Sequence, residues 1–268
     1  MAVNHPGFLP SSVVVDLLDE VLQAKLLETN QLMIEPDRSV EAIKRLVGAS
    51  IGRDITFFKA FLFLLTETTH ESARANDGEG WHNDASCNDV DGECLNVWIP
   101  LYCSAKSSGL RIAPRHRNEW LYSALPRPRA RLDVLTKTKR PDLFDPDSSD
   151  DLLIIDKDNG GGISARLSDI DIEDVSNVTV GDAAIFSQSD LHQGMHAEGV
   201  RIQLTLKFLT AGTSHIANQR YMPAPTPPSL SKHGRLERQL MQELLSLQSV
   251  HIRENGRSLA MFTRSHAR

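Results

Sequence analysis

The segment from Arg201 to Leu209 constrains the fold most, because apolar and polar side chains alternate along nearly all of it. Successive side chains of a β-strand point to opposite faces of its sheet. One face of this segment carries Ile202, Leu204, Leu206 and Phe208, and the other carries Arg201, Gln203, Thr205 and Lys207. Such alternation is typical of a strand with one buried face, so the chain is expected to build a sheet around this segment.

Other segments point to further strands. Ile55 to Leu65 is continuously apolar and rich in Phe, which favours a buried strand or pair of strands. Residues 95–101 alternate again, and Pro100 predicts an edge position or a strand end because proline donates no hydrogen bond. Gly109 to Ala113 and Val178 to Phe186 are two more short candidates.

Helices are expected at both ends of the chain. Apolar residues at helical spacing follow Pro10 and Ser11, and Ser39 to Ala49 shows a second such pattern, so residues 10–50 are interpreted as helical support. Leu236 to Val250 predicts an amphipathic C-terminal helix. The whole chain, 1–268, is interpreted as a single mainly β domain with flanking helices. Its core, about residues 54–210, is expected to be a double-stranded β-helix, the jelly-roll or cupin-like barrel.

An acidic segment interrupts this core between about residues 141 and 177, and it contains three consecutive glycines, Gly160 to Gly162. The simpler interpretation is a solvated surface insertion. The alternative is a mobile lid over a binding site, because lids favour glycine-bearing, weakly packed segments.

Composition excludes several classes of partner. The net charge of −6 argues against nucleic acid or an anionic membrane surface as the main partner. No apolar run reaches the length of about 18 residues that a membrane-spanning helix needs, and the first ten residues do not read as a signal peptide. Cys87, Cys94 and Cys103 are too few for a disulfide framework, which favours a reducing, cytoplasmic compartment.

Two histidines are followed by an acidic residue two positions later, in His82-Asn83-Asp84 and His196-Ala197-Glu198. With ten histidines and 35 acidic residues among 268 positions, about one such pair is expected by chance, so context must distinguish them. If His196 and Glu198 bound a metal ion together with His215, too little chain would be left for the intervening strands. His82 and Asp84 point to one face of an extended backbone, and His192 is favoured over His196 to join them.

The order of the motifs carries a resemblance to a known family. His82-Asn83-Asp84 is followed by Asn96-Val97-Trp98-Ile99-Pro100-Leu101, then by Ser108 to Arg117, Gly181-Asp182 to Phe186, Leu191-His192-Gln193-Gly194 and Arg201. Over about residues 54–210 this resembles the phytanoyl-CoA dioxygenase-like branch of the non-haem Fe(II)/2-oxoglutarate oxygenases. The chain departs from the family at Pro114-Arg115-His116, where Pro-Gly-Ser-His is usual, and Arg201 follows His192 more closely than is typical.

The resemblance implies roles for five residues. His82, Asp84 and His192 would be the iron ligands and the catalytic centre, Arg201 would pair with the distal carboxylate of 2-oxoglutarate, and Gln203 would also contact this cosubstrate. Two histidines and one carboxylate hold Fe(II) on one face and leave positions open for other ligands. Arginine can grip a carboxylate through two parallel hydrogen bonds. The implied cofactors are Fe(II), 2-oxoglutarate as cosubstrate and O2.

The implied activity is that of a dioxygenase, an oxidoreductase that releases succinate and carbon dioxide while it oxidises an unactivated carbon of a small molecule. Hydroxylation is the expected outcome, since related halogenases lack the carboxylate that Asp84 supplies. Desaturation, cyclisation and epimerisation use the same triad. The family favours secondary metabolites or amino-acid derivatives as substrates. Two other readings remain: a barrel of the same fold that binds a metal or ligand without catalysis, and a cupin-like hydrolase or isomerase with another metal.

Overall fold

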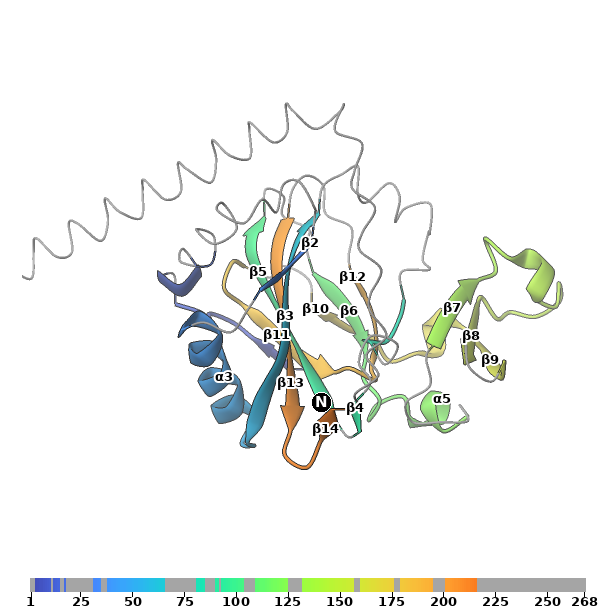
Figure 1. Cartoon of the computed structure of the whole chain (residues 1–268). Coiled ribbons are helices and arrows are strands. Elements are labelled where there is room, and N and C mark those ends of the chain that lie inside the picture. Colours follow the sequence, from blue (N-terminus) through green and yellow to red (C-terminus); the bar gives the residue numbers. More distant parts are fainter. Residues whose placement is uncertain are drawn as a thin grey trace, which may run out of the picture.

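The computed structural model describes residues 3–10, 12–14, 17, 31–34, 38–65, 81–84, 90–91, 93–103, 109–124, 132–156, 160–175, 179–194 and 201–215. In these ranges the strands pair antiparallel and form one six-stranded sheet with smaller sheets beside it (Figure 1). This confirms the mainly β class predicted from the alternating segments.

The six-stranded sheet has the order β1-β11-β5-β13-β3-β2. Its strands are β1 (Val3–His5), β11 (Ala183–Ser187), β5 (Cys94–Cys103), β13 (Arg201–Thr210), β3 (Ile55–Leu65) and β2 (Gln31–Ile34). The predicted strand from residue 201 is thus β13, which pairs with β3 on one side and β5 on the other. β1 and β2 were not expected from the sequence, which predicted only helices before residue 50.

The prediction that Pro100 marks a strand end or an edge strand was wrong. Pro100 lies inside β5, which has neighbours on both sides, and the strand neither ends there nor forms an edge. The pairing register between β5 and β13 shifts between Ile202 and Gln203, next to the position where Gln203 faces Pro100. A bulge is one of the few places in a sheet where a residue without an N–H is tolerated.

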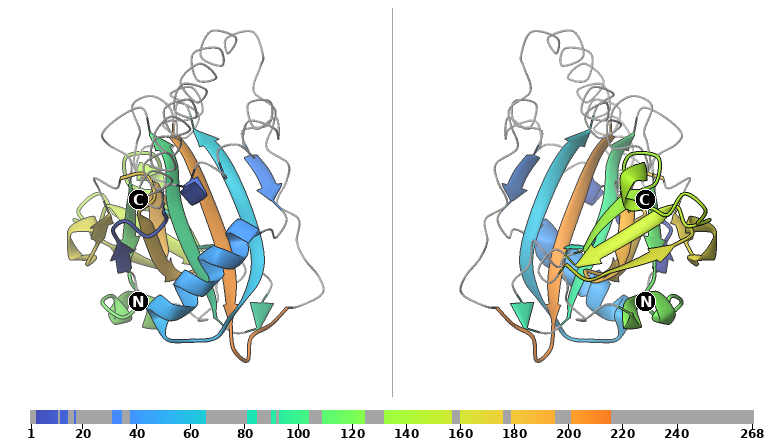
Figure 2. Two further views of the ribbon diagram at one scale, coloured as in Figure 1. Left: turned by 90° about the vertical axis from the view of Figure 1, so that its left-hand side faces the viewer. Right: turned by 90° about the vertical axis from the view of Figure 1, so that its right-hand side faces the viewer.

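The apolar face of β13 packs against α3 (Arg38–Ile51), which lies across one side of the sheet (Figure 2). This helix confirms the prediction for Ser39 to Ala49. Val40, Ile43 and Val47 are fully buried in the core that includes the four apolar residues of β13. Leu46 is 38% exposed, because the buried positions repeat at three and four residues and leave Leu46 to one side.

A second sheet closes the barrel on the opposite face. It has the order β10-β6-β12 and contains β10 (Glu173–Val175), β6 (Leu110–Ala113) and β12 (Leu191–Gly194). Trp98 of β5 and Phe186 of β11 pack with Ile112 of β6 and Val175 of β10 in one buried cluster. The polar face of β13 therefore points into a barrel of two facing sheets, which agrees with the predicted jelly-roll.

The acidic segment at 141–177 contains regular structure. It begins with the short helix η2 (Pro141–Leu143) and continues with β8 (Leu152–Asp156), β9 (Gly162–Ala165), the short helix η3 (Leu167–Asp169) and β10. β8 pairs with β9 and with β7 (Leu132–Thr136) to form a three-stranded sheet. Alternate residues of β8, Leu152 and Ile154, are buried with Trp81 in a separate core. The segment thus supplies a packed extension and, in β10, a strand of the barrel itself.

The other described elements are small or partly described. They are α5 (Glu119–Ser123) and a two-stranded sheet of β4 (Val90–Asp91) and β14 (Ser214–His215). Residues 12–14 and 17 are helical, with Val14 and Leu17 in the main core, as the pattern after Pro10 predicts. The helix predicted at 236–250 lies outside the described residues, as does Cys87. None of the described helices is long and apolar enough to cross a membrane.

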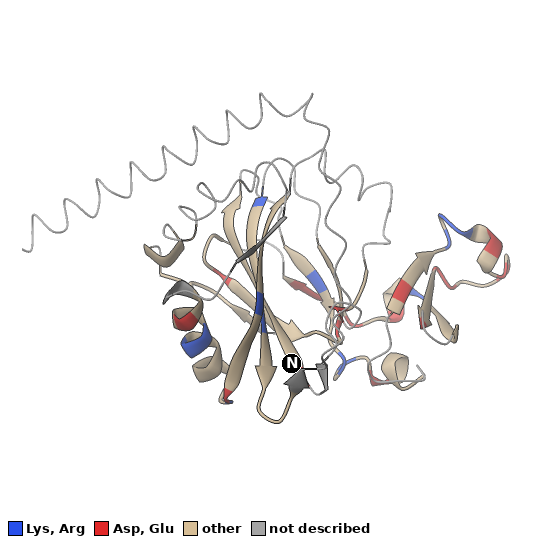
Figure 3. Ribbon diagram, in the orientation of Figure 1, with Lys and Arg blue, Asp and Glu red and all other residues tan. Residues whose placement is uncertain are grey.

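Charged residues gather on α3 and around β7–β9, whereas most of the large sheet is uncharged (Figure 3).

Candidate metal centre

The backbone brings His82 and His192 side by side, although they are far apart in the sequence. The amide of His82 donates to the carbonyl of His192 over 3.0 Å, and the amide of His192 donates to the carbonyl of His82 over 2.8 Å. His82 also forms a bridge with Asp133 of β7, so this single residue joins β12 to the three-stranded extension. The Asp84 amide donates to the carbonyl of Gln188 over 3.0 Å. The segment 81–84 is therefore held by backbone bonds beside the start of β12.

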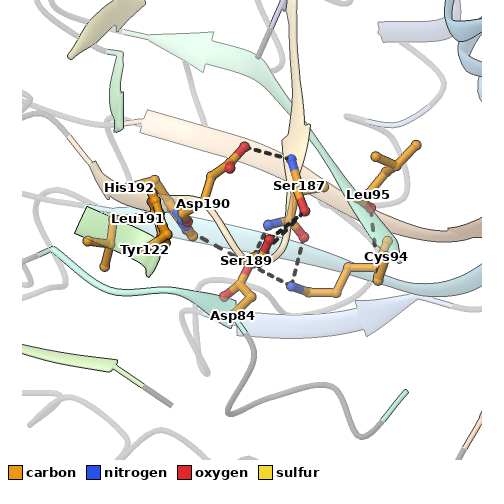
Figure 4. A network of polar contacts seen from close by, with 11 residues as sticks. Asp84, Cys94, Leu95, Tyr122, Ser187, Ser189, Asp190, Leu191 and His192 are labelled. Carbon is orange, nitrogen blue, oxygen red and sulfur yellow. Dashed lines mark hydrogen bonds and ion pairs between the residues drawn. The ribbon is translucent and has the colours of Figure 1, made fainter. Parts of the chain in front are cut away.

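The three predicted ligands come together at this joint. Ligand atoms of His82, Asp84 and His192 lie within 4.8 Å of one another, and the structure places no other such group among the described residues. The two imidazole centroids are 4.3 Å apart, and His192 Nε2 lies 3.8 Å from Asp84 Oδ2. His192 is buried and Asp84 is half-buried, whereas His82 is exposed. Figure 4 shows His192 and Asp84 within one network of polar contacts. Two imidazoles and one carboxylate in this arrangement could hold a metal ion.

His192 is in the state that a metal ligand requires. Its Nδ1 lies 3.0 Å from the carbonyl oxygen of Asp190, a contact in which protonated Nδ1 donates and Nε2 keeps a lone pair. Burial, together with the neighbouring His82, lowers the pKa of His192 to about 4. Asp84 acts in the opposite direction, but its effect is smaller. The imidazole is therefore neutral near pH 7, with Nε2 directed at Asp84.

Asp84 is held as a carboxylate by its neighbours. Burial alone would raise its pKa, but the charge of Lys207, together with both histidines, outweighs burial and keeps the pKa well below the usual range. Lys207 Nζ donates to Asp84 Oδ2 over 2.7 Å. Asn96 Nδ2 donates to the same oxygen over 2.6 Å. The carboxylate is thus negative near neutral pH and is fixed in place by these two donors.

Lys207 and Asn96 are part of the site, yet the sequence assigned them no role there. Lys207 is 4% exposed and Asn96 is fully buried. They face each other across the β13–β5 pair, and Lys207 Nζ also donates to Asn96 Oδ1 over 3.0 Å. The sequence did contain a signal for Lys207, because the alternation along β13 places it on the same inward face as Arg201 and Gln203. The alternation gives the face of the strand, but not how deep in the barrel a residue lies.

Arg201 begins β13 on the same inward face, as predicted, and it is only 2% exposed. Its guanidinium carbon lies 5.6 Å from the centroid of the Trp98 ring. A side-chain carbon added at Gly194 of β12 would lie 3.6 Å from Arg201 Nη2, so the guanidinium approaches β12 just beyond His192. Burial lowers the pKa of Arg201 to about 10, which leaves it a cation near neutral pH. The barrel interior therefore carries a buried positive charge near the end of β12.

Two further polar atoms close to Arg201 suit a ligand. In the part of the chain that the structure describes, Trp98 Nε1 and Gln203 Oε1 are buried and make no hydrogen bond. Buried polar groups are nearly always hydrogen-bonded, so atoms of this kind mark positions where a bound molecule can supply the missing partner. Gln203 lies two residues from Arg201 on the same strand face, as predicted. A cation with a neighbouring N–H donor fits an anionic group.

Two members of the competing ligand set lie outside the described residues. These are His196 and Glu198. His215 lies in β14, which pairs with Val90 and Asp91 in a separate small sheet.

Comparison with solved structures gives the fold but no family. No protein-family model matches the sequence, and no curated protein matches it. The structure resembles SnoK, a non-haem alpha-ketoglutarate-dependent carbocyclase from nogalamycin biosynthesis, with a TM-score of 0.51 and 12% identity over 88% of this chain and 85% of that chain. The epimerase SnoN from the same biosynthesis gives a TM-score of 0.49 and 14% identity over 84% of this chain and 86% of that chain.

EvdO2 from Micromonospora carbonacea var. aurantiaca, solved with 2-oxoglutarate, gives a TM-score of 0.47 and 12% identity over 84% of this chain and 92% of that chain. The fold assignment rests on SnoK. The chain therefore has the jelly-roll fold found in non-haem 2-oxoglutarate-dependent enzymes, as predicted. The narrower resemblance to the phytanoyl-CoA dioxygenase-like branch stays a prediction.

Proposed function

We propose that this chain is an Fe(II)- and 2-oxoglutarate-dependent oxygenase that hydroxylates an unactivated carbon of a small molecule. The observation that carries the proposal is the meeting of His82, Asp84 and His192 inside the same barrel that buries Arg201. The three residues come from two separate parts of the chain, and a chance His-x-acid pair has no reason to meet a third ligand.

The residues fit a divalent iron ion. A neutral imidazole, a second imidazole and an ionised carboxylate are the donor set of mononuclear Fe(II) sites that leave positions open for other ligands. His192 keeps its Nε2 lone pair, and Asp84 stays negative. When bound, iron and 2-oxoglutarate would supply the oxidising chemistry with O2, and the cosubstrate would leave as succinate and carbon dioxide. The protein itself holds the ligands and excludes water.

The residues also fit 2-oxoglutarate, a dianion. Arg201 can pair with one of its carboxylates through two hydrogen bonds, and Trp98 Nε1 is a buried donor beside it. Gln203 would add a contact through its amide. Burying a cation to this extent is costly unless its charge is compensated, and a carboxylate of 2-oxoglutarate would supply such compensation at Arg201.

Asp84 supports oxygenation over halogenation. Related halogenases have a small residue in place of this carboxylate, and the space it leaves admits a halide. Here Asp84 is present and fixed by two hydrogen bonds. Hydroxylation is therefore proposed first, and cyclisation or epimerisation on the same site would be recognised by their products.

The first experiment is anaerobic. We expect addition of Fe(II) and 2-oxoglutarate to the metal-free protein to produce a weak visible absorption band, and we expect oxygen to yield succinate. His192→Ala should abolish the band, while Lys44→Met, on the far side of the large sheet, should leave it unchanged. No band and no succinate from the unmodified chain would refute the assignment, and metal binding without either would favour a non-catalytic binding barrel.

The second experiment concerns the substrate and the reaction. The net charge of −6 favours a small molecule over nucleic acid, and a secondary metabolite or amino-acid derivative is the class proposed. Incubation with a panel of such molecules should give a product that gains one oxygen atom. A product that loses two hydrogens would indicate desaturation or ring closure, and a product of unchanged mass but altered configuration would indicate epimerisation.

A further inference from the structure

Lys207 is a buried lysine that lies beside the candidate metal ligand Asp84. Lys207 Nζ lies 2.7 Å from Asp84 Oδ2, and its side chain is 5% exposed. It points inward from the middle of β13, where a strand buried on both faces would ordinarily carry an apolar residue. A buried ammonium is costly unless a negative group compensates it, and the ion pair with Asp84 provides this compensation.

Three side chains close this contact into a ring. Lys207 donates to Asp84 Oδ2 and to Asn96 Oδ1, and Asn96 Nδ2 donates to Asp84 Oδ2. They come from three places: the segment 81–84, β5 and β13. Lys207 and Asp84 are 123 residues apart in the sequence, so the ring ties the ligand segment to the centre of the large sheet. Asp84 is therefore in position before any metal ion binds.

We propose that Lys207 is a built-in counter-ion: it takes the place of the metal ion at Asp84 in the metal-free protein and thereby lowers the affinity of the site for divalent metal. The inference rests on the proposed metal centre. An incoming dication must share Asp84 with the ammonium and bears its repulsion at short range in a buried site, where charges interact more strongly than in water. Asn96 is the neutral member of the ring and keeps both groups in register.

An electrostatic and a merely structural role of Lys207 predict opposite effects of its removal on metal affinity. If Lys207 only braced the site, removing it would disorder Asp84 and weaken metal binding. If Lys207 competes with the metal for the charge of Asp84, removing it leaves a buried carboxylate without a cation, and metal binding becomes tighter. The metal-free protein becomes less stable at the same time, because Asp84 then lacks its partner.

The test is calorimetric titration of the metal-free full chain with Mn(II), which removes oxidation of Fe(II) as a complication. Lys207→Met removes the charge while keeping most of the length and volume of the side chain. We expect it to bind Mn(II) at least about tenfold more tightly than the unmodified chain. Its metal-free form should melt at a lower temperature, and Mn(II) should raise the melting temperature by more than in the unmodified chain. A Lys207→Met protein that folds only with Mn(II) supports the same conclusion.

Two controls accompany this variant. Lys207→Arg keeps the charge and should keep the weak affinity to within a few-fold. Lys44→Met removes the same charge from the surface of α3, where Lys44 is 3.9 Å from Glu41, and should leave Mn(II) binding unchanged. If Lys44→Met changes Mn(II) binding as much as Lys207→Met does, net charge and not the ring is responsible, and the proposal is wrong.

A second variant covers the case in which Lys207→Met does not fold at all. Asn96→Asp retains Lys207 and the size of the side chain but adds a negative charge to the ring, so Mn(II) should bind more tightly. Equal or weaker binding by the folded variants overturns the counter-ion role and leaves the proposed metal centre intact. If the unmodified chain binds no Mn(II), no Co(II) and no Fe(II), the metal centre itself is wrong and the inference falls with it.

Discussion

Acidifying the metal-free protein should destabilise it through His192. The imidazole has a pKa of about 4 in the folded protein, against its ordinary value of 6.5. The unfolded chain therefore takes up a proton at this position at a higher pH than the folded chain does. As the pH falls below about 6.5, protonation favours the unfolded state, and stability is lost until the folded imidazole is also protonated near pH 4.

The size of the loss follows from the two pKa values. Between about pH 7 and about pH 4.5, the lower pKa of His192 should cost about 2.5 kcal/mol of unfolding free energy. Asp84 has the opposite dependence. Its lowered pKa gives a stabilisation that is present above its ordinary value of 3.8 and is lost only in stronger acid, so it adds little in this window.

The assay is urea unfolding of the metal-free chain at several pH values, with His192→Gln as the matched variant. The variant lacks the titrating group, whereas other titrating groups, such as Asp190, with its pKa raised by burial, are common to both proteins. As the pH falls from about 7 to about 4.5, the unmodified chain should therefore lose about 2.5 kcal/mol more unfolding free energy than His192→Gln does. Parallel curves would refute the reasoning, because they would mean that His192 is not buried as a neutral imidazole.

Three other changes test the site and its support. Arg201→Ala should weaken 2-oxoglutarate binding by roughly 2 kcal/mol, read from a titration of the anaerobic absorption band, with Mn(II) affinity little changed; an unchanged cosubstrate affinity would contradict its role. Leu204→Ala, at a fully buried position of β13, should cost about 2–5 kcal/mol in urea unfolding, and a cost below about 1 kcal/mol would contradict its place in the core. Tyr122→Phe removes a hydroxyl that donates to the carbonyl of Ala113 and accepts from the amide of Leu191, each over 2.7 Å, and should cost about 1–3 kcal/mol; an unchanged stability would show that water replaces it.

Local patterns were sufficient to predict much of the sheet, whereas the ligand group was implied by the family resemblance. The alternation along β13 depends only on which face of the strand is buried, and the structure places Ile202 and Arg201 on opposite faces as expected. The resemblance, which rests on the order of the motifs, implied that His82, Asp84 and His192 lie together, and the structure places them within 4.8 Å of one another. Their use as metal ligands is the part that the Mn(II) titration addresses.

Other features depend on contacts that no local pattern contains. The acidic segment was interpreted from its charge, but the buried face of β8 is formed by Leu152 and Ile154, which pack on residues of distant segments. β1 and β2 are three and four residues long, too short for a periodicity to be recognised. Lys207 was assigned to the correct face of its strand. Its approach to Asp84 depends on the depth of each residue in the barrel, which is set by the packing of the two sheets.

The long separation between the members of the site has a consequence for folding. Asp84 and Lys207 are 123 residues apart, and β13 also carries Arg201 and is one of the two central strands of the large sheet. Closing a loop of this length costs chain entropy before any contact repays it, and chains rich in such contacts fold slowly. On the ribosome, the three candidate ligands leave the exit tunnel before β13 does, so we expect a nascent chain truncated before residue 201 to lack both a complete sheet and the Arg201 and Lys207 side chains of the site.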